Sequence, residues 1–135
     1  MKKKILIVYA SYYKDISDNL LYNALEHLKN TYNLNIFNKG VVFTEVPGVF
    51  EIPITIATRI KYYDGFIALG CVIKGETPHF DFISNAATQA IMNLSVDSKK
   101  PIGNGIITCL NMKQAKARSK KGKEAAKAVI SILEQ

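Results

Sequence analysis

Hydrophobic residues follow two patterns along this chain: short continuous runs, and longer stretches in which they recur every three or four positions. A continuous run predicts a strand that is covered on both faces, as in a parallel sheet. Such runs cover residues 5–10, 34–44 (as one strand or as two short pieces), 66–73 and 102–109. The helical spacing predicts helices over residues 16–31, 52–63, 80–96 and 121–134, with a short helix capped by Asn111.

Strands that alternate with helices predict an α/β fold, in which a parallel sheet is wound right-handedly and carries helices on both faces. The 135 residues contain no repeat, linker or low-complexity tract, so we expect residues 1–135 to form one domain. No apolar run approaches the roughly 20 residues that span a bilayer. We therefore expect no membrane partner.

The formal net charge of +7 raises a nucleic-acid hypothesis, but the arrangement of the basic residues argues against it. Lysines gather at residues 2–4 and 113–127 without interleaved aromatic residues, so we expect their charge to attract small anions instead. In the second cluster Arg118 stands out, because a guanidinium binds phosphate through two hydrogen bonds. Cys71 and Cys109 are not spaced as metal ligands and predict two reduced, buried thiols in the cytoplasm.

The stretch 70–85, G-C-V-I-K-G-E-T-P-H-F-D-F-I-S-N, carries the clearest candidate chemistry. It predicts a strand, a tight turn and then a helix, with backbone freedom at Gly75, an N-cap at Thr77 and Pro78 in the first helical position. Free N–H groups and the helix dipole at such a turn form an anion site, typically for phosphate. His79 follows directly and suits proton transfer near neutral pH, with a purely structural histidine as the alternative.

Other side chains are expected at the same carboxyl edge of the sheet, where ligands bind in parallel α/β folds. Tyr12 or Tyr13 would stack on a flat ligand or would simply be an exposed loop residue. Glu51 falls in the first turn of a helix, where it caps the helix or binds ligand hydroxyls, and the sequence favours capping. The topology also predicts residues 75–79 and the glycine-rich break at 103–105 at this edge.

Motifs of several other enzyme classes are missing from the sequence. It has no G-x-G-x-x-G, no Walker G-K-[ST], no G-x-S-x-G elbow and no cluster of metal ligands. Hydride transfer, nucleotide hydrolysis, acyl transfer and zinc chemistry therefore lack the residues that they need, and no metal is expected.

Two stretches resemble the signature segments of the lumazine synthase family: V-P-G-V-F-E-I-P at residues 46–53, and A-L-G-C-V-I-K-G-E-T-P-H-F-D at residues 68–81. The ending is similar too, with Q-A at 114–115, then Arg118, then K-G-K-E-A-A at 121–126. The likeness covers nearly the whole chain in the right order. It implies a flavodoxin-like three-layer αβα fold with a four-stranded parallel sheet, assembled as homopentamers or sixty-subunit shells, with active sites between neighbouring subunits.

The resemblance also implies a reaction. The family condenses 5-amino-6-(D-ribitylamino)uracil with 3,4-dihydroxy-2-butanone 4-phosphate to 6,7-dimethyl-8-ribityllumazine, phosphate and water, without a metal or organic cofactor. This is the penultimate step of riboflavin biosynthesis, and the implied partners are small-molecule substrates and further copies of the chain. Two alternatives stay open: an archaeal-type riboflavin synthase, against which the intact G-E-T-P-H turn argues, and a non-catalytic flavin- or lumazine-binding protein.

By the same resemblance, His79 matches the histidine that acts as acid and base in phosphate elimination and in later proton transfers. Glu76 and Thr77 match the phosphate turn, and Arg118 matches the phosphate-binding arginine. The residues that match the pyrimidine- and ribityl-binding positions are Tyr12, Val49, Phe50, Glu51, Cys71, Val72, Ile73 and Asn104.

Three features depart from the family pattern. Tyr12 follows Ser11 where the family usually has Phe after Arg, although tyrosine can also stack. Asn104 stands where a Phe from the neighbouring subunit is common, which alters one wall of the ring pocket. The link between Arg118 and Lys121 lacks the longer glycine-rich segment of the usual family members.

Overall fold

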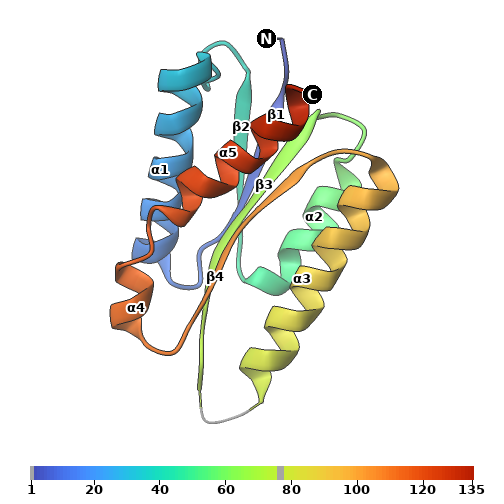
Figure 1. The fold of residues 1–135 in the computed structure, drawn as a ribbon. Helices are drawn as coiled ribbons and strands as arrows, with labels where there is room; N and C mark the ends of the chain where they lie inside the picture. Colours follow the sequence, from blue (N-terminus) through green and yellow to red (C-terminus); the bar gives the residue numbers. More distant parts are fainter. Residues whose placement is uncertain (1, 76–77) are drawn as a thin grey trace.

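The computed structural model describes residues 2–75 and 78–135, which form one sheet with helices on both faces (Figure 1). The strands are β1 (Ile5–Ala10), β2 (Val41–Val46), β3 (Gly65–Ile73) and β4 (Ile102–Cys109). The helical elements are α1 (Lys14–Tyr32), the 3-10 turn η1 (Val49–Glu51), α2 (Ile52–Thr58), α3 (His79–Ser98), α4 (Met112–Lys116) and α5 (Lys121–Leu133). Across the described residues, no helix is both long and apolar enough to cross a membrane.

The four strands are parallel in the order β2-β1-β3-β4, so β1 and β3 are the central strands. Both central strands are buried along most of their length, as their continuous apolar runs predict. The helices α1 and α5 cover one face of the sheet, and α2 and α3 cover the other (Figure 1). The predicted α/β fold, a flavodoxin-like three-layer arrangement around a four-stranded parallel sheet, is confirmed.

The sheet divides the hydrophobic core into two layers. Successive side chains of a strand point to opposite faces, and β1 contributes to both layers. On the side of α1 and α5 it contributes Ile5, Ile7 and Tyr9. On the side of α2 and α3 it contributes Leu6, Val8 and Ala10. Because the central strands β1 and β3 are occupied by core contacts on both faces, a ligand can approach them only where they end.

Two predicted boundaries are wrong. Residues 34–40 are not a strand, because the side-chain oxygen of Asn35 accepts two backbone N–H hydrogen bonds at 3.0 Å and holds this segment in a turn. The helix predicted over residues 52–63 ends at Thr58, because the chain then forms hydrogen-bonded turns that lead to β3. The Asn111 cap is confirmed, with its side chain accepting the Gln114 N–H at 2.9 Å. The remaining elements lie where the apolar patterns predict them, with small shifts at their ends.

Candidate active site

A pocket of about 590 Å³ lies at the carboxyl ends of the central strands β1 and β3. Its walls come from the loop after β1, from η1, from the end of β3 and from the first turns of α3. Among the predicted site residues, this pocket is lined by Tyr12, Val49, Phe50, Glu51, Cys71, Val72, Ile73 and His79. Gly48 and Ile83 also line the pocket but were not predicted from the sequence. Ile83 could have been predicted, because it lies about one helical turn after His79 and therefore on the same face of the helix.

Gly70 of β3 explains how η1 comes so close to the sheet. A Cβ atom at this position would lie 2.8 Å from a methyl carbon of Val49 and 3.2 Å from the Cβ of Ala10. Val49 is therefore buried against the sheet, while the next residue, Phe50, is 64% exposed. Tyr12, which also lines the pocket, is 75% exposed.

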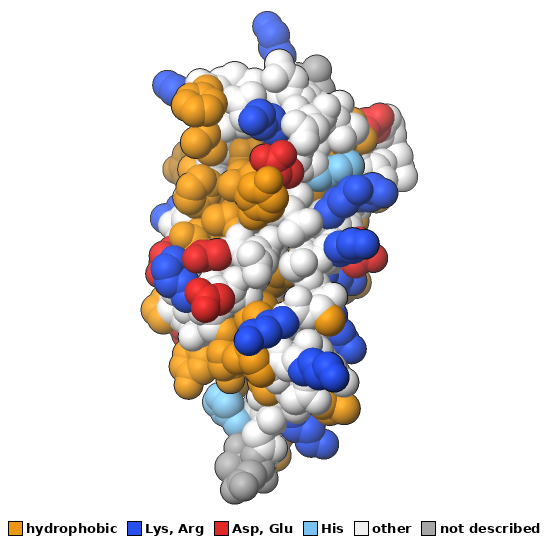
Figure 2. Space-filling view, turned by 90° about the vertical axis from the view of Figure 1, so that its left-hand side faces the viewer, with side chains coloured by type: hydrophobic (Ala, Val, Ile, Leu, Met, Phe, Trp, Pro, Cys, Tyr) orange, Lys and Arg blue, Asp and Glu red, His pale blue; other side chains and the backbone are white. Residues whose placement is uncertain are grey.

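Figure 2, viewed from the side of α1, shows exposed hydrophobic side chains along one edge and lysine and arginine side chains along the other.

Glu51 ends η1 and directly precedes α2. Glu51 is the N-cap residue of α2, as the sequence favours, although within the part of the chain that the structure describes its side chain makes no capping hydrogen bond. Its backbone N–H donates to the Gly48 carbonyl oxygen at 3.1 Å, which closes the turn. The carboxylate lines the pocket instead, and there it can accept hydrogen bonds from ligand hydroxyls.

His79 is the first residue of α3 and lines the pocket. Pro78 is the N-cap rather than the first helical residue, and its carbonyl oxygen accepts two N–H hydrogen bonds from the first turn at 3.1 and 3.2 Å. No described glycine has a positive φ, so the backbone freedom expected of Gly75 is not used. The predicted cap Thr77 and its neighbour Glu76, expected at the phosphate turn, lie outside the described residues.

Two predicted site residues, Asn104 and Arg118, lie elsewhere. They line a second pocket of about 500 Å³ beside β4 and the start of α5. Asn104 pairs with Ala68 in the first half of β3, whereas the first pocket lies at the far end of that strand. The expectation that residues 103–105 share the carboxyl edge with His79 is therefore wrong for a single chain.

The second pocket is mainly basic. Arg118 Nη1 donates to the Thr108 carbonyl oxygen at 3.0 Å. Lys120 and Lys121 line the same pocket, together with Glu124. Sequence reasoning named neither lysine as a site residue, although both belong to the second lysine cluster. Three cations against one carboxylate favour an anionic ligand here.

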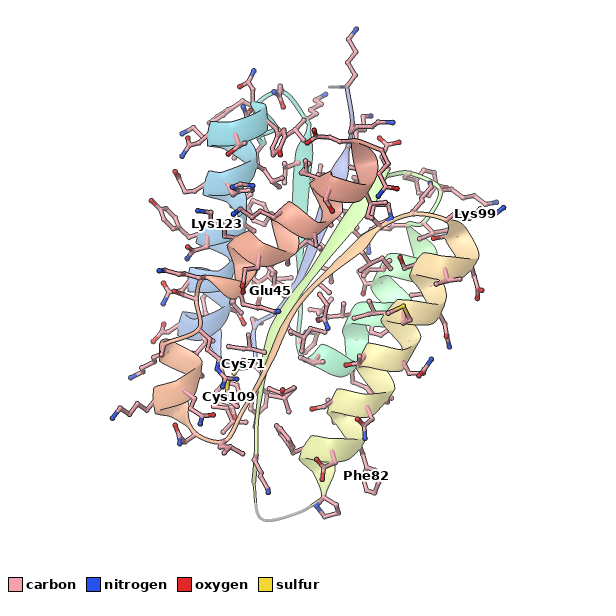
Figure 3. All side chains as sticks on the ribbon, in the orientation of Figure 1. Glu45, Cys71, Phe82, Lys99, Cys109 and Lys123 are labelled. Atoms are coloured by element: carbon pink, nitrogen blue, oxygen red, sulfur yellow. The ribbon has the colours of Figure 1, made fainter. Side chains whose placement is uncertain are left out.

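The thiols of Cys71 and Cys109 lie side by side on β3 and β4 (Figure 3). Both are free and buried, as predicted. Burial raises the pKa of Cys71 to about 12, and the neighbouring Cys109 adds to the effect. Cys71 is therefore a neutral wall of the first pocket rather than a nucleophile. Neither thiol belongs to a metal site, since no group of three His, Cys, Asp or Glu among the described residues could hold an ion.

The sequence is similar to known proteins along nearly its whole length. The profile of the 6,7-dimethyl-8-ribityllumazine synthase family matches residues 2–135. The protein of that name from Agrobacterium fabrum is 42% identical over 148 residues, covering 98% of this chain and 94% of the relative. Proteins named for the same enzyme from Bartonella bacilliformis and Rhodopseudomonas palustris are each 44% identical, covering 89% and 96% of this chain and 78% and 83% of their own lengths. The chain therefore belongs to the 6,7-dimethyl-8-ribityllumazine synthase family.

Proposed function

We infer that this protein condenses 5-amino-6-(D-ribitylamino)uracil with 3,4-dihydroxy-2-butanone 4-phosphate, forming 6,7-dimethyl-8-ribityllumazine, phosphate and water. It is a transferase of riboflavin biosynthesis. The observation that carries this function is a pocket shared by His79, Glu51 and the apolar end of β3, in a chain that matches the family from residue 2 to residue 135. We also propose that it works in the cytoplasm, because its two cysteines are free thiols.

The pyrimidine would lie against the end of β3. Val72 and Ile73 line the pocket there, and burial keeps the Cys71 thiol neutral, so this wall offers apolar contact. The exposed ring of Tyr12 would stack on the pyrimidine face, since aromatic rings attract one another in offset arrangements. The Glu51 carboxylate would accept hydrogen bonds from the ribityl hydroxyls.

His79 would transfer the protons of the reaction. Loss of phosphate from the ketone phosphate begins with removal of a proton next to the carbonyl group, and ring closure with loss of water needs further transfers. An imidazole can accept and donate a proton near neutral pH, so one side chain can serve each of these steps. The position of His79 in the first turn of α3, on the pocket wall, supports this role.

The phosphate site would need a second copy of the chain. Arg118 and Asn104 line a different pocket from His79, so a single chain does not join the arginine to the histidine. A neighbour that docks its second pocket against the first pocket would complete the site. Because the two docking surfaces differ, repeated docking gives a ring where the rotation between neighbours closes, and we propose a homopentamer, alone or as the unit of a sixty-subunit shell. The exposed rings of Tyr12 and Phe50 support burial at such an interface.

One assay tests this function against its alternatives. The purified protein is mixed with both substrates, and the appearance of the lumazine is followed together with the release of phosphate. Equal amounts of the two products are expected. Binding of lumazine without formation of either product would indicate a non-catalytic binding protein. Formation of riboflavin from lumazine alone would indicate a riboflavin synthase.

A further inference from the structure

Glu45, labelled in Figure 3, connects the end of β2 to the loop that follows β1. It pairs with Tyr9 in the parallel register, and the Tyr9 hydroxyl donates to its Oε1 atom at 3.2 Å. The Ser11 hydroxyl donates to the other carboxylate oxygen, Oε2, at 2.7 Å. The Ser11 N–H donates to the Val46 carbonyl oxygen at 3.0 Å. Both the side chain and the backbone of Ser11 are thus attached to β2.

The loop attached in this way contains only residues 11–13. Its other end is tied as well, because the Ser17 hydroxyl donates to the Ala10 carbonyl oxygen and the Ser17 N–H donates to the Tyr13 carbonyl oxygen at 3.0 Å. Tyr12 lies in the middle of the loop, lines the first pocket and is 75% exposed. The ring meets that of Tyr13 edge-on, with centroids 5.0 Å apart and planes at 78°. Anchored neighbours therefore present this ring, since Ser11 is bound to β2 and Tyr13 packs against the core.

The Glu45 carboxylate is chemically suited to hold the loop. Its hydrogen bonds with Ser11 and Tyr9 keep its pKa below the usual value, so the group is charged at neutral pH. Hydrogen bonds to a charged acceptor are roughly twice as strong as those between neutral groups. The distance between the Ser11 hydroxyl and the Glu45 carboxylate is that of a well-formed hydrogen bond from a hydroxyl donor.

We propose that Ser11 and Glu45 are positioning residues for pyrimidine binding: their hydrogen bond fixes the loop so that Tyr12 is ready to stack on the ring before the substrate arrives. This rests on the function proposed above, since it assigns the Tyr12 ring to that substrate. Ordering an exposed aromatic side chain only when the ligand binds costs affinity, and an anchored loop reduces that cost. The effect concerns pyrimidine binding and leaves proton transfer and phosphate binding unchanged.

The test compares Ser11→Ala and Glu45→Gln with two control variants, Ser131→Ala and Glu26→Gln. Each control alters a hydrogen bond that stays within one helix and away from the pocket. Both loop variants are expected to raise the KM for the pyrimidine and the Kd for the lumazine about three- to tenfold. The kcat and the KM for the ketone phosphate should stay within about twofold. The controls should match the wild type.

A second set of variants shows whether the effect passes through the Tyr12 ring. In a Tyr12→Ala background, Ser11→Ala should cause no further loss of lumazine affinity, because the ring that it positions is gone. Ser11→Thr keeps the hydroxyl and should preserve the wild-type affinity. A loss that persists without the Tyr12 ring would overturn the proposal, as would a lower melting temperature with unchanged KM.

The positioning role and the enzyme function can fail separately. Lumazine affinity is measured from the fluorescence of the ligand, which requires no turnover. A wild-type protein that binds lumazine but makes none contradicts the enzyme function, while the affinities of the variants still decide the role of the loop. If the wild-type protein turns over its substrates, but Ser11→Ala and Glu45→Gln both bind lumazine as tightly as the wild type, only the positioning role is contradicted.

Discussion

Arg118 is held against the end of β4 by a hydrogen bond from its Nη1 atom to the Thr108 carbonyl oxygen, at 3.0 Å. A guanidinium carries five N–H donors, so one such bond still allows bidentate binding of a phosphate. The neighbouring Cys109 sulfur lies 3.9 Å from the same nitrogen. Arg118 is therefore an anchored cation, in a pocket that the histidine of the same chain does not share.

Arg118→Ala is expected to raise the KM for the ketone phosphate about ten- to a hundredfold, since a charged hydrogen-bond partner of the phosphate is lost. The KM for the pyrimidine should change less than about threefold. Arg118→Lys should recover only part of the loss, because an ammonium group cannot bind phosphate bidentately. Steady-state kinetics with each substrate varied in turn measures both effects. Equal losses for both substrates would make Arg118 a structural residue.

Mixed assemblies can show whether one active site uses two subunits. His79→Ala and Arg118→Ala damage different pockets, so both should be weak when assayed alone at low ketone phosphate concentration. In randomly mixed assemblies, about a quarter of the sites would join an intact first pocket to an intact second pocket. Activity should therefore reappear when the two variants are co-expressed. If one subunit held the whole site, every site would carry one damaged residue and mixing would restore nothing.

His79→Ala should lower kcat about a hundred- to ten-thousandfold, the usual contribution of a general acid or base. The melting temperature and the size of the assembly by light scattering should match the wild type, because His79 lies on a pocket wall at the start of α3. The other histidine, His27, is outside the pocket, and His27→Ala serves as the control with unchanged kcat. A dissociated or unfolded His79 variant would favour a structural role.

The contact between α5 and α1 leaves no space for a side chain at Gly122, because a Cβ atom there would overlap the Leu20 carbonyl group. Gly122→Ala should lower the free energy of unfolding by about 1–3 kcal/mol, as overpacking does. A decrease in the free energy of unfolding would be informative, because alanine in a helix is normally more stable than glycine by about 1 kcal/mol. Gly75→Ala is the control, since no atom of the described residues lies within 4 Å of the added carbon. Urea denaturation of both variants measures the difference.

His27 on α1 should make the free energy of unfolding depend on pH. Burial lowers its pKa below 6.5, and Lys123 and Lys127 lower it further. Its Nε2 atom is buried without a hydrogen-bond partner among the described residues. The folded state thus binds a proton less readily than the unfolded state, so the free energy of unfolding falls as the pH drops from 6.5 towards the folded-state pKa.

Urea denaturation at about pH 7.5 and pH 5.5 brackets the titration of histidine. The wild type should lose stability between these values, and His27→Gln should lose less because it has no proton to bind. An unchanged pH dependence in His27→Gln would assign the effect to other groups.

Local sequence patterns predict most of the elements, because burial on both faces forces a continuous apolar strand, and burial on one face forces helical spacing. The pattern misleads at residues 34–40, where apolar residues suggest a strand but asparagine side chains bind the backbone in a turn. At Glu51 the pattern correctly predicts a residue at the start of α2, and the structure adds that this residue lines the pocket. At residues 34–40, side-chain hydrogen bonding rather than periodicity decides the outcome.

The sequence by itself determined that Tyr12, Glu51 and His79 share one pocket, because right-handed parallel crossovers bring the ends of β1, β2 and β3 and the segments that follow to one edge. Only the tertiary structure decided that Asn104 and Arg118 lie in another pocket. The register of β4 sets how far along the sheet each residue falls, and no local period encodes that register. For the same reason, only the folded chain brings a carboxylate from β2 to the loop that carries Tyr12.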